Sequence, residues 1–525
     1  ILNDLCKWMD EHGVLATLRH GFKCYGRLLK VAFFKSAHSM NPELEAHYAA
    51  NQVGITRQLF FSVRSKQSLD VVLSVNGIPV ATLELKNPLT GQTVEYAREQ
   101  YKNDRDPREP IFEFKRRTLV HFAVDTEAVL MATRLAGKAT HFLPFNKGDN
   151  GGAGNPPDPA GRTYRTAYLW EEVLQRDSLL DLLAQFVHLQ TDEKRDEHGR
   201  KVKTETIIFP RYHQLQAVRM LTTTAQREGV GHNYLVEHSA GSGKSNTIAW
   251  LGHRLASLHN AKNERVFDSV IIITDRLVLD RQLQDNVYQF EHKMGVVQKI
   301  DEDSRQLAEA LENAVPIIIT TLQKFPHVSR HLEKMAEERG KDKTGRLSTR
   351  RCAVIIDEAH SSQGGEAATG LKEVLGGEAL HNEAKKRAEE EGEADMTLLF
   401  RDIAKRGQQA NLSFFAFTAT PKHKTLAVFG RDGLPMHRYT MRQAIEEGFI
   451  LDVLKNYTTY KAYYNLIKAC EEDPNVERKK AARALARFMQ LHPYNISQKT
   501  EIMVEHFQTV TRHKIGGRAK AMVVT

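Results

Sequence analysis

The chain has 525 residues, and 41% of them are hydrophobic, which is enough to build several buried cores. At roughly 150 residues per domain, this length suggests three or four domains. Lys and Arg number 74 against 65 Asp and Glu, so the formal net charge of +9 suits a polyanionic partner. No apolar run approaches the ~18 residues that a membrane span needs, so we expect no membrane association.

The four cysteines are scattered along the chain and form no CxxC pair. This pattern argues against a structural zinc site or a disulfide framework, and it favours a reducing, cytoplasmic location. No signal peptide is evident, although the sequence begins at Ile1 rather than at Met.

A β-hairpin is the first expected element with chemical content. Residues 69–75 alternate between apolar and polar side chains, and residues 78–86 form a second strand-like run. Between them, Asn76-Gly77 is the strongest short hairpin signal. The turn therefore has either two residues or three, the third being Ile78.

The length of this turn sets the pairing register of the hairpin. A two-residue turn pairs Asp70 with Leu83 and directs Glu84 to the other face of the sheet. A three-residue turn pairs Asp70 with Glu84 and leaves Lys86 on their face. We predict the three-residue turn, and Pro79 is consistent with irregular pairing beside it.

In that register the hairpin has the residues of a metal-dependent nuclease. Asp70 and Glu84 would bind Mg²⁺, which polarises a scissile phosphate and supplies a hydroxide nucleophile. Lys86 would orient the water or stabilise the developing negative charge. The alternative is an ordinary exposed Glu–Lys strand, because the Glu84-Leu-Lys86 spacing also occurs by chance.

Three polar segments interrupt the apolar patterning. Residues 146–162 are rich in Gly, Pro and Asn and predict a loop. Residues 191–206 are almost wholly charged or polar and predict a solvated linker. Residues 383–395 are charged at helical spacing, which is typical of an exposed helix or an insertion.

Residues 230–420 alternate short apolar runs with amphipathic stretches. The runs are β-rich and mostly uninterrupted, as strands buried on both faces of a parallel sheet are. Polar residues follow each run, where the strand ends of an open α/β sheet hold ligands. The expected strands are Tyr234–Val236, Val270–Ile273, Ile317–Ile319, Val354–Ile356 and Phe414–Phe417.

A glycine-rich loop between the first of these strands and a helix predicts a nucleotide site. Gly241 and Gly243 let backbone N–H groups close around phosphate oxygens, and Ser242 lies between them. Lys244 would reach the β- and γ-phosphates, and the Ser245 hydroxyl would bind Mg²⁺. The loop departs from the general pattern at its first position, which is His238 instead of glycine.

A second acidic signature, Asp357-Glu358-Ala-His360, follows the expected strand at 354–356. Asp357 would hold Mg²⁺, mainly through water, and Glu358 would polarise the attacking water. His360 could couple the site to neighbouring elements.

Together these motifs resemble superfamily 2 helicases and translocases, over about residues 200–440. The resemblance implies that Gln214 reads adenine and that ATP and Mg²⁺ are cofactors. It also implies residues that contact the nucleic-acid backbone and residues that couple ATP state to DNA grip. The first group is Arg276, Thr321 and Lys324, and the second is Thr418 and Thr420.

Residues 1–190 resemble the N-terminal region of type I restriction motor subunits, which carry a PD-(D/E)xK nuclease ahead of the ATPase. Type III restriction subunits carry the nuclease after it. The matching motifs, in order, are Arg57-Gln58, Leu69-Asp70, Asn76-Gly77, Glu84-Leu85-Lys86-Asn87-Pro88 and Ala97-Arg-Glu-Gln100-Tyr101. That family has a glutamine and a tyrosine near the DNA; Gln100 and Tyr101 match, and Gln92 with Tyr96 also has the family's spacing.

The last residues, Ala521–Thr525, resemble the first strand of a second RecA-like domain. Superfamily 2 enzymes close ATP between two such domains, and the second supplies an arginine. We therefore expect this chain to bind ATP, to hydrolyse it poorly and not to translocate. The role of residues 441–515 stays open between a spacer and a docking surface.

The sequence thus predicts an α/β multidomain protein. The expected order is an endonuclease-like domain at 1–190, a linker at 191–206 and a first RecA-like domain at 207–440. A connecting helical segment and the truncated start of a second RecA-like domain follow at 441–525. The resemblance implies ATP-dependent translocation and cleavage of double-stranded DNA, with separate methyltransferase (M) and specificity (S) subunits. The alternatives are a stand-alone helicase with a non-cleaving DNA-binding domain and a non-enzymatic scaffold.

Overall fold

The computed structural model contains two compact units, Ile1–Ile450 and Leu451–Thr525. It describes residues 1–36, 41–195, 201–274, 287, 296–300, 304–321, 324, 328, 331, 350–359, 411–452, 493–514 and 519–523. The predicted positions Arg276 and His360, the segment 383–395 and most of 441–515 lie outside the described residues.

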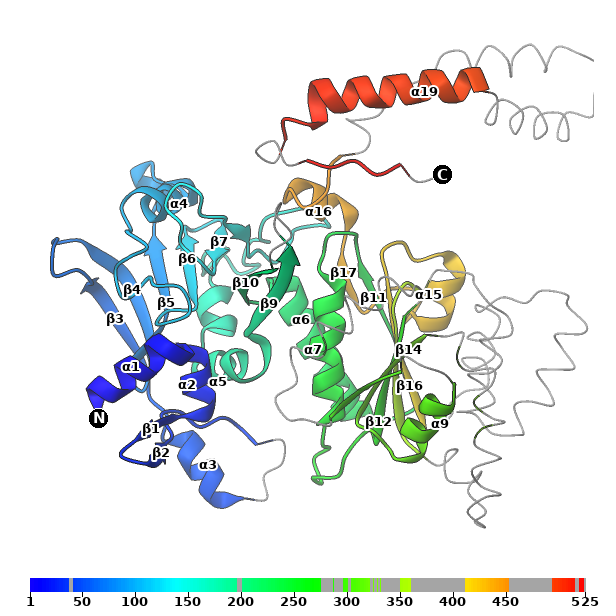
Figure 1. Ribbon diagram of the computed structural model, residues 1–525, viewed down its shortest axis with the longest axis horizontal. Coiled ribbons are helices and arrows are strands. Elements are labelled where there is room, and N and C mark those ends of the chain that lie inside the picture. Colours follow the sequence, from blue (N-terminus) through cyan, green and yellow to red (C-terminus); the bar gives the residue numbers. More distant parts are fainter. Residues whose placement is uncertain are drawn as a thin grey trace, which may run out of the picture. The chain divides into compact units, whose positions relative to one another are not determined.

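The N-terminal part of the first unit is built on a six-stranded sheet in the order β3-β4-β5-β6-β7-β8 (Figure 1). Its neighbouring strands are antiparallel except β5 and β6, which are parallel. The strands are β3 (Val53–Phe60), β4 (Ser68–Val75), β5 (Ile78–Leu85), β6 (Val120–Val124), β7 (Val129–Ala132) and β8 (Leu143–Pro144).

The turn between β4 and β5 differs from the prediction. Val75 pairs with Ile78, so the turn has two residues, and the predicted three-residue turn is wrong. The physical reason is that Asn76 and Gly77 both adopt positive φ, at +50° and +85°. This is the backbone that a two-residue turn needs to match the twist of its strands.

The register nevertheless becomes the one that the nuclease site requires. The β4–β5 ladder shifts at a β-bulge, where Val80 is the additional residue of β5. Pro79, next to it, has no N–H to donate to a regular ladder. Carried to the far end of the hairpin, the shifted register sets Asp70 opposite Glu84.

Helix α4 (Val94–Asn103) connects β5 to β6 and covers one face of this sheet. Ala97 and Tyr101 of α4 pack with Val72 in a separate apolar cluster. The Tyr101 hydroxyl is also hydrogen-bonded to Thr82 Oγ1 at 2.8 Å. Because side chains alternate along a strand, Glu84 leaves β5 on the same face as Thr82.

Short elements complete this part of the chain. They are α1 (Leu2–His12), α2 (Val14–His20), β1 (Phe22–Cys24), β2 (Arg27–Leu29), α3 (Pro42–Ala49), η1 (Pro88–Thr90), η2 (Leu169–Val173), α5 (Arg176–Asp181) and η3 (Leu182–Phe186). The predicted loop at 146–162 is confirmed, since it contains only one isolated bridge, between Asp149 and Gly152.

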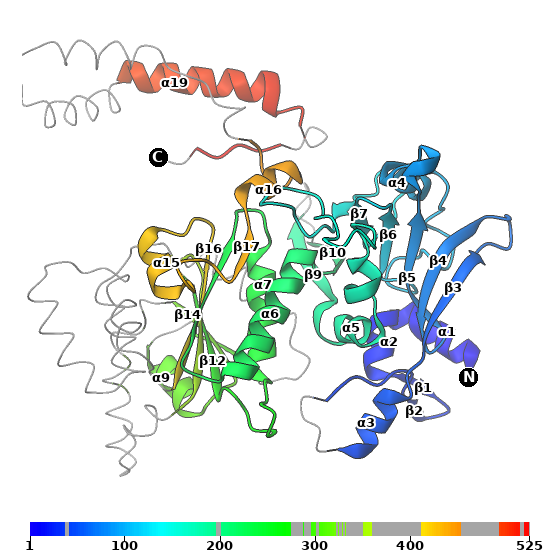
Figure 2. The same cartoon turned by 180° about the vertical axis from the view of Figure 1, so that it is seen from behind.

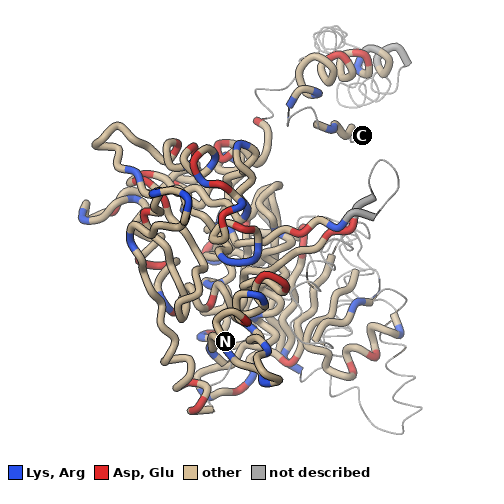
Figure 3. The backbone as a smooth tube through the Cα atoms, turned by 60° about the vertical axis from the view of Figure 1, so that its left-hand side comes forward, with Lys and Arg blue, Asp and Glu red and all other residues tan. Residues whose placement is uncertain are grey.

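The predicted linker at 191–206 is wrong, because most of it lies in a β-ribbon. Strands β9 (His188–Arg195) and β10 (Lys201–Ile208) pair antiparallel along their whole length. Opposite charges face each other across the ribbon, with Lys203 Nζ 3.3 Å from Glu193 Oε1. Figure 3 shows both charge signs along these strands. The charged side chains of this segment, which predicted a solvated linker, are therefore partly paired with each other across the ribbon.

The second sheet has seven strands in the order β13-β14-β12-β15-β16-β11-β17, and all neighbours are parallel (Figure 2). It contains all five predicted strands, which are confirmed. The strands are β11 (Asn233–His238), β12 (Ser269–Thr274), β13 (Val297–Lys299), β14 (Ile317–Thr321), β15 (Cys352–Ile356), β16 (Leu412–Thr418) and β17 (His437–Tyr439).

Helices cover both faces of this sheet. On one face α6 (Tyr212–Glu228) and α7 (Lys244–Ala256) lie side by side, and α7 packs on β12, β14 and β15 (Figure 1). On the other face α9 (Ser304–Glu312) packs with the alternate side chains of the same strands. Helix α15 (His423–Phe429) follows β16 and contacts β11 and β16.

The boundary expected after residue 440 lies at 450 instead. Helix α16 (Met441–Glu446) belongs to the first unit, and its Gln443 and Ala444 are buried. Glu446 of α16 accepts a hydrogen bond of 2.7 Å from the Ala153 amide in the 146–162 loop. A contact far apart in sequence therefore holds this helix to the first unit.

The second unit is described only in part. It contains α19 (Pro493–His506) followed by η6 (Phe507–Thr511). Residues 519–523, which include most of the expected final strand, are in no strand of the structure. None of the described helices is long and apolar enough to span a bilayer.

Candidate functional site

The first candidate site lies at the end of the β4–β5 hairpin. Both oxygens of Asp70 are held by the protein: Gln58 Nε2 donates to Oδ1 at 3.1 Å, and the Leu85 amide donates to Oδ2 at 2.8 Å. Gln58 has φ of +50° inside β3 and also accepts a bond from Ser68. Such strain in a non-glycine residue is maintained only where the surroundings enforce it.

Glu84 lies beside Asp70 and is fully buried, at 0% exposed. Its Oε1 accepts from Arg105 Nε at 2.7 Å and is also 2.7 Å from Arg105 Nη2. Its Oε2 has no hydrogen-bond partner in the described part of the chain. Burial raises the pKa of Glu84 to about 7; the Asp70 charge adds to this rise and Arg105 opposes it.

Lys86 follows two residues after Glu84, so its side chain leaves the same face. Its amide donates to the Val124 carbonyl of β6 at 2.8 Å, which extends the β5 pairing. Within the described residues, its ammonium has no hydrogen-bond or ion-pair partner. The register thus gives two carboxylates and a lysine on the face that α4 covers.

The two candidate glutamine–tyrosine pairs differ in their surroundings. Tyr101 is buried against β5, and Gln100 before it is half-buried. Gln92 precedes α4 and is exposed, while Tyr96 is 56% exposed. Tyr101 therefore packs in the fold, and Tyr96 is the tyrosine with a face free to meet a ligand.

The donor chemistry of this site fits a hard divalent cation. Asp70 and Glu84 supply carboxylate oxygens, which Mg²⁺ prefers, and the orphaned Glu84 Oε2 lacks the partner that a cation would provide. No cluster of three or more potential metal ligands occurs among the residues that the structure describes. Water or substrate oxygens would complete the coordination shell, as is usual for Mg²⁺.

The second candidate site lies where β11 meets α7. Gly241 and Gly243 have φ of +73° and +77°, so the loop between strand and helix needs glycine at both. Helix α7 begins at Lys244, and its N-terminal N–H groups point into this loop. Lys244 Nζ is 3.2 Å from Glu358 Oε1, so the lysine and the second acidic signature meet as predicted from their motifs.

Gln214 lies under the loop and is 4% exposed. Its Nε2 donates to the Gly243 carbonyl at 3.0 Å, and its Oε1 accepts from the Arg211 amide at 2.9 Å. Arg211 Nη2 donates to the Gly241 carbonyl at 2.9 Å, and its guanidinium lies 3.9 Å from the Phe449 ring centroid. Gln214 and Arg211 thus stabilise the loop through hydrogen bonds to its carbonyl groups.

The surroundings of His238 account for a histidine, instead of glycine, at the first position of the loop pattern. It is the last residue of β11 and has ordinary strand φ, so glycine is not needed there. Its Nε2 lies 3.0 Å from His437 Nδ1, and His437 Nε2 lies 3.1 Å from Gln216 Oε1. The amide oxygen can only accept, so each histidine donates through Nε2, and His238 Nδ1 remains an acceptor.

Three buried polar atoms around this loop have no partner among the described residues. They are Arg211 Nη1, His238 Nδ1 and Ser242 Oγ. Buried polar groups are normally paired, so unpaired ones at a helix N-terminus fit a polar ligand. The donor set, with Lys244 and the half-buried Ser245, fits a nucleotide phosphate.

The acidic signature follows β15, as predicted. Asp357 Oδ1 accepts from the Glu358 amide at 3.0 Å, and Glu358 has φ of +52°, rare for a residue with a side chain. The Ala359 amide donates to the Phe417 carbonyl at 2.9 Å. Thr418 follows, and its Oγ1 accepts from the Thr420 amide at 3.3 Å. The two motifs are therefore joined through backbone.

The predicted nucleic-acid contacts are less accessible than expected. Thr321, at the end of β14, is 3% exposed and pairs with Thr274 of β12. The Lys324 ammonium donates to the Ile300 carbonyl. Arg276 lies outside the described residues.

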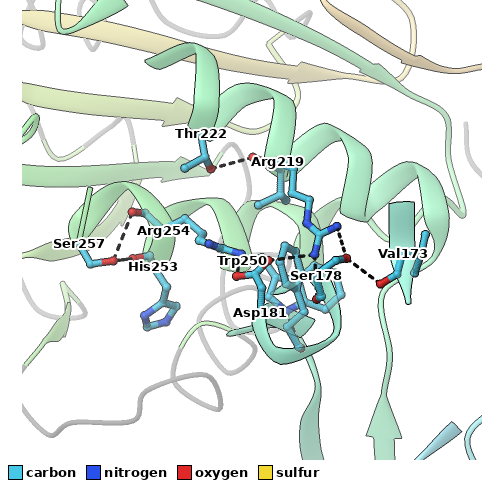
Figure 4. A network of polar contacts seen from close by, with 11 residues as sticks. Val173, Ser178, Asp181, Arg219, Thr222, Trp250, His253, Arg254 and Ser257 are labelled. Carbon is cyan, nitrogen blue, oxygen red and sulfur yellow. Dashed lines mark hydrogen bonds and ion pairs between the residues drawn. The ribbon is translucent and has the colours of Figure 1, made fainter. Parts of the chain in front are cut away.

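Asp181, at the end of α5, connects the N-terminal part to helices that cover the second sheet (Figure 4). Its carboxylate pairs with Arg219 of α6 at 3.0 Å and with Arg254 of α7. Both guanidinium groups also lie over the Phe186 ring, and Trp250 Nε1 donates to the Phe186 carbonyl at 2.8 Å. The helix that starts at Lys244 is thus tied directly to the N-terminal part.

Sequence reasoning missed Arg105 and the bracing role of Arg211. Arg105 follows α4 in a run of charged residues, and nothing local distinguishes it from its neighbour Arg108, which is exposed. Arg211 could have been noticed, because it stands three residues before Gln214 in a segment already assigned to the nucleotide.

Comparison with known proteins identifies both parts of the chain. The family model for the SWI2/SNF2 ATPase matches residues 213–478, just over half of the chain. The model for the type I restriction enzyme R protein N terminus matches residues 30–140.

Two of the proteins similar to this chain are type I restriction endonuclease subunits. The SsaAORF53P endonuclease subunit of Staphylococcus saprophyticus is 23% identical over 79% of this chain and 37% of its own length. The HindI endonuclease subunit of Haemophilus influenzae is 25% identical over 78% of this chain and 35% of its own. This chain therefore spans about a third of the length of these relatives.

A solved fragment described as the HsdR subunit of a type I restriction enzyme from Vibrio vulnificus is 15% identical, with a TM-score of 0.29. It aligns with 84% of this chain and 65% of that one. From the two family models, the chain belongs to the SWI2/SNF2 ATPase family and carries, ahead of the ATPase domain, the N-terminal domain of type I restriction enzyme R proteins.

Proposed function

We propose that this chain provides the endonuclease and motor activities of a type I restriction enzyme. Its substrate would be double-stranded DNA, which is translocated at the expense of ATP and then cut in both strands. The observation that carries the proposal is the bulge-shifted register, which sets Asp70 beside Glu84 in a chain that also has a glycine-rich loop at the start of α7.

Cleavage would use the β4–β5 site. Asp70 and Glu84 would hold Mg²⁺, which when bound polarises the scissile phosphate and generates hydroxide. Gln58 and the Leu85 amide keep the Asp70 carboxylate in one orientation. Lys86 would stabilise negative charge that develops on the phosphate, because its ammonium is not committed to another group of the described chain.

ATP would bind at the β11–α7 loop. Lys244 and the α7 N-terminus would contact the phosphates, and Ser245 with Asp357 would hold Mg²⁺. Glu358, which lies 3.2 Å from Lys244 Nζ, would leave the lysine when ATP binds and would orient the attacking water. Thr418 and Thr420 would pass the nucleotide state on, through their backbone link to the acidic loop.

The partners that we propose are DNA and the M and S subunits of the same complex. The net charge of +9 favours binding to DNA. We propose a cytoplasmic location, which the free thiols Cys6, Cys24 and Cys352 support.

The test separates the two sites within the enzyme complex that contains this chain. Lys86→Ala should abolish DNA cleavage and leave DNA-stimulated ATP hydrolysis within about twofold of wild type. Lys244→Ala should abolish both, because cleavage depends on translocation. Lys23→Ala, at an exposed position in β1, is the control and should change neither. Full cleavage by Lys86→Ala would remove the nuclease assignment.

A further inference from the structure

Arg105 is an arginine buried at the nuclease site, with 4% of its surface exposed. Among the described residues, its guanidinium contacts Glu84, Ser68 and Phe61. Nε and Nη2 approach the Glu84 Oε1 atom at 2.7 Å, and Nη2 also donates to the Ser68 carbonyl at 3.0 Å. The Phe61 ring centroid lies 5.3 Å from its central carbon. This arginine is thus fixed on several sides.

The contacts are asymmetric with respect to the Glu84 carboxylate. Arg105 takes Oε1 with two nitrogens and leaves Oε2 without a partner in the described chain. A bidentate arginine would satisfy both oxygens, which is the common arrangement for a purely structural pair. Here the free oxygen is on the carboxylate that lies next to Asp70.

The Asp70 carboxylate is also restrained by the protein. Gln58 and the Leu85 amide restrain its two oxygens with single hydrogen bonds, and each carboxylate oxygen can accept a further contact. Two carboxylates side by side repel each other. The Arg105 charge compensates part of this repulsion without contacting Asp70.

We propose that Arg105 is a positioning residue of the nuclease metal site: by holding Glu84 Oε1, it presents Oε2 toward the position between Glu84 and Asp70 where a divalent cation binds. This inference rests on the proposed nuclease function. In this role Arg105 would act through Glu84 and would not itself contact the metal. Partners that orient a metal ligand in this way typically contribute 10–100-fold to metal affinity.

The experiment measures binding of Mn²⁺ alone, without nucleotide, to the whole chain by electron paramagnetic resonance. Arg105→Met keeps the apolar stem and removes the guanidinium, and it should weaken the Glu84-dependent Mn²⁺ affinity by about tenfold or more. Arg105→Lys should also weaken it, because one ammonium cannot hold Glu84 Oε1 and the Ser68 carbonyl with the same geometry. Arg108→Met, three residues on and exposed, should bind Mn²⁺ as wild type does.

Each result tests either the positioning role of Arg105 or the proposed nuclease function. If Arg105→Met or Arg105→Lys binds Mn²⁺ as tightly as wild type, the positioning role is refuted and the ion pair is only structural. Tighter binding would also refute it, since Arg105 would then compete with the cation. If Arg105→Met does not fold, Arg105→Lys decides. If Glu84→Gln binds Mn²⁺ as wild type does, no metal site exists there, and the proposed nuclease function fails independently of Arg105.

Discussion

Replacing Asp181 with Asn tests whether the ion pairs at the end of α5 hold the N-terminal part to the ATPase domain. The substitution keeps the shape of the side chain and removes its charge. Asp181, Arg219 and Arg254 are 28%, 29% and 23% exposed, so they are partly but not fully desolvated. A hydrogen bond to a charged group contributes ~1.5–3 kcal/mol, and an exposed ion pair ~0–1 kcal/mol.

For two pairs at this intermediate exposure, we expect Asp181→Asn to lower the free energy of unfolding by about 1–3 kcal/mol. The assay is urea unfolding of the whole chain, followed by tryptophan fluorescence, because Trp250 lies in the same contact. We expect the midpoint of the transition to shift to a lower urea concentration.

Glu309→Gln is the matched control. It removes an Arg305 contact on the surface of α9, where the side chains are 64% and 45% exposed. This pair should contribute at most ~0.5 kcal/mol. Equal shifts for Asp181→Asn and Glu309→Gln would refute the claim that the Asp181 contacts join the two parts.

Two further predictions concern buried histidines and the phosphate loop. Burial lowers the pKa of His121 to about 3 and that of His437 to about 4, so both are neutral in the folded chain. The unfolded chain takes up their protons below pH ~6.5. Their contribution to stability is therefore present above that pH and is lost as pH falls toward 4, by ~1.4 kcal/mol per pH unit for each histidine. Urea midpoints at pH 7.5 and pH 5 check this: His121→Gln should flatten the slope, and a slope equal to that of the wild type in this variant would contradict it. Gly243→Ala would place a Cβ 2.5 Å from Gln214 Nε2 at a φ of +77°, so nucleotide affinity measured with a fluorescent ATP analogue should fall at least tenfold. Gly433→Ala, at φ of +73° with open space around it, should leave this affinity unchanged, and equal effects of the two would show that backbone strain alone matters.

The parallel sheet was predictable because its signal is local. Runs such as Ile317–Ile319 are apolar without interruption, and only strands buried on both faces tolerate that. The short strand His437–Tyr439 was not predicted, because three residues with a histidine and an arginine carry no such signal. It is a strand only because the exposed edge of β11 offers it a ladder.

The hairpin shows a correct pairing reached for the wrong reason. Asp70 lies opposite Glu84 only if the hairpin has one additional residue, and the prediction placed that residue in the turn. Asn76-Gly77 keeps its preferred two-residue turn, and the additional residue is accommodated at Val80. Both arrangements have the same register beyond the bulge, so the pattern of the strands could not distinguish them.

The sequence by itself determined the chemistry that each segment can perform: a glycine loop with Lys244, an acidic pair after a buried strand, and two carboxylates with a lysine on a hairpin. These are local properties, because spacing and backbone preference act over a few residues. Only the tertiary structure decided which groups meet. Arg105 reaches Glu84 across 21 residues, and Asp181 reaches Arg254 across 73. Such contacts depend on how helices and sheets pack, and no short stretch of sequence encodes that distance.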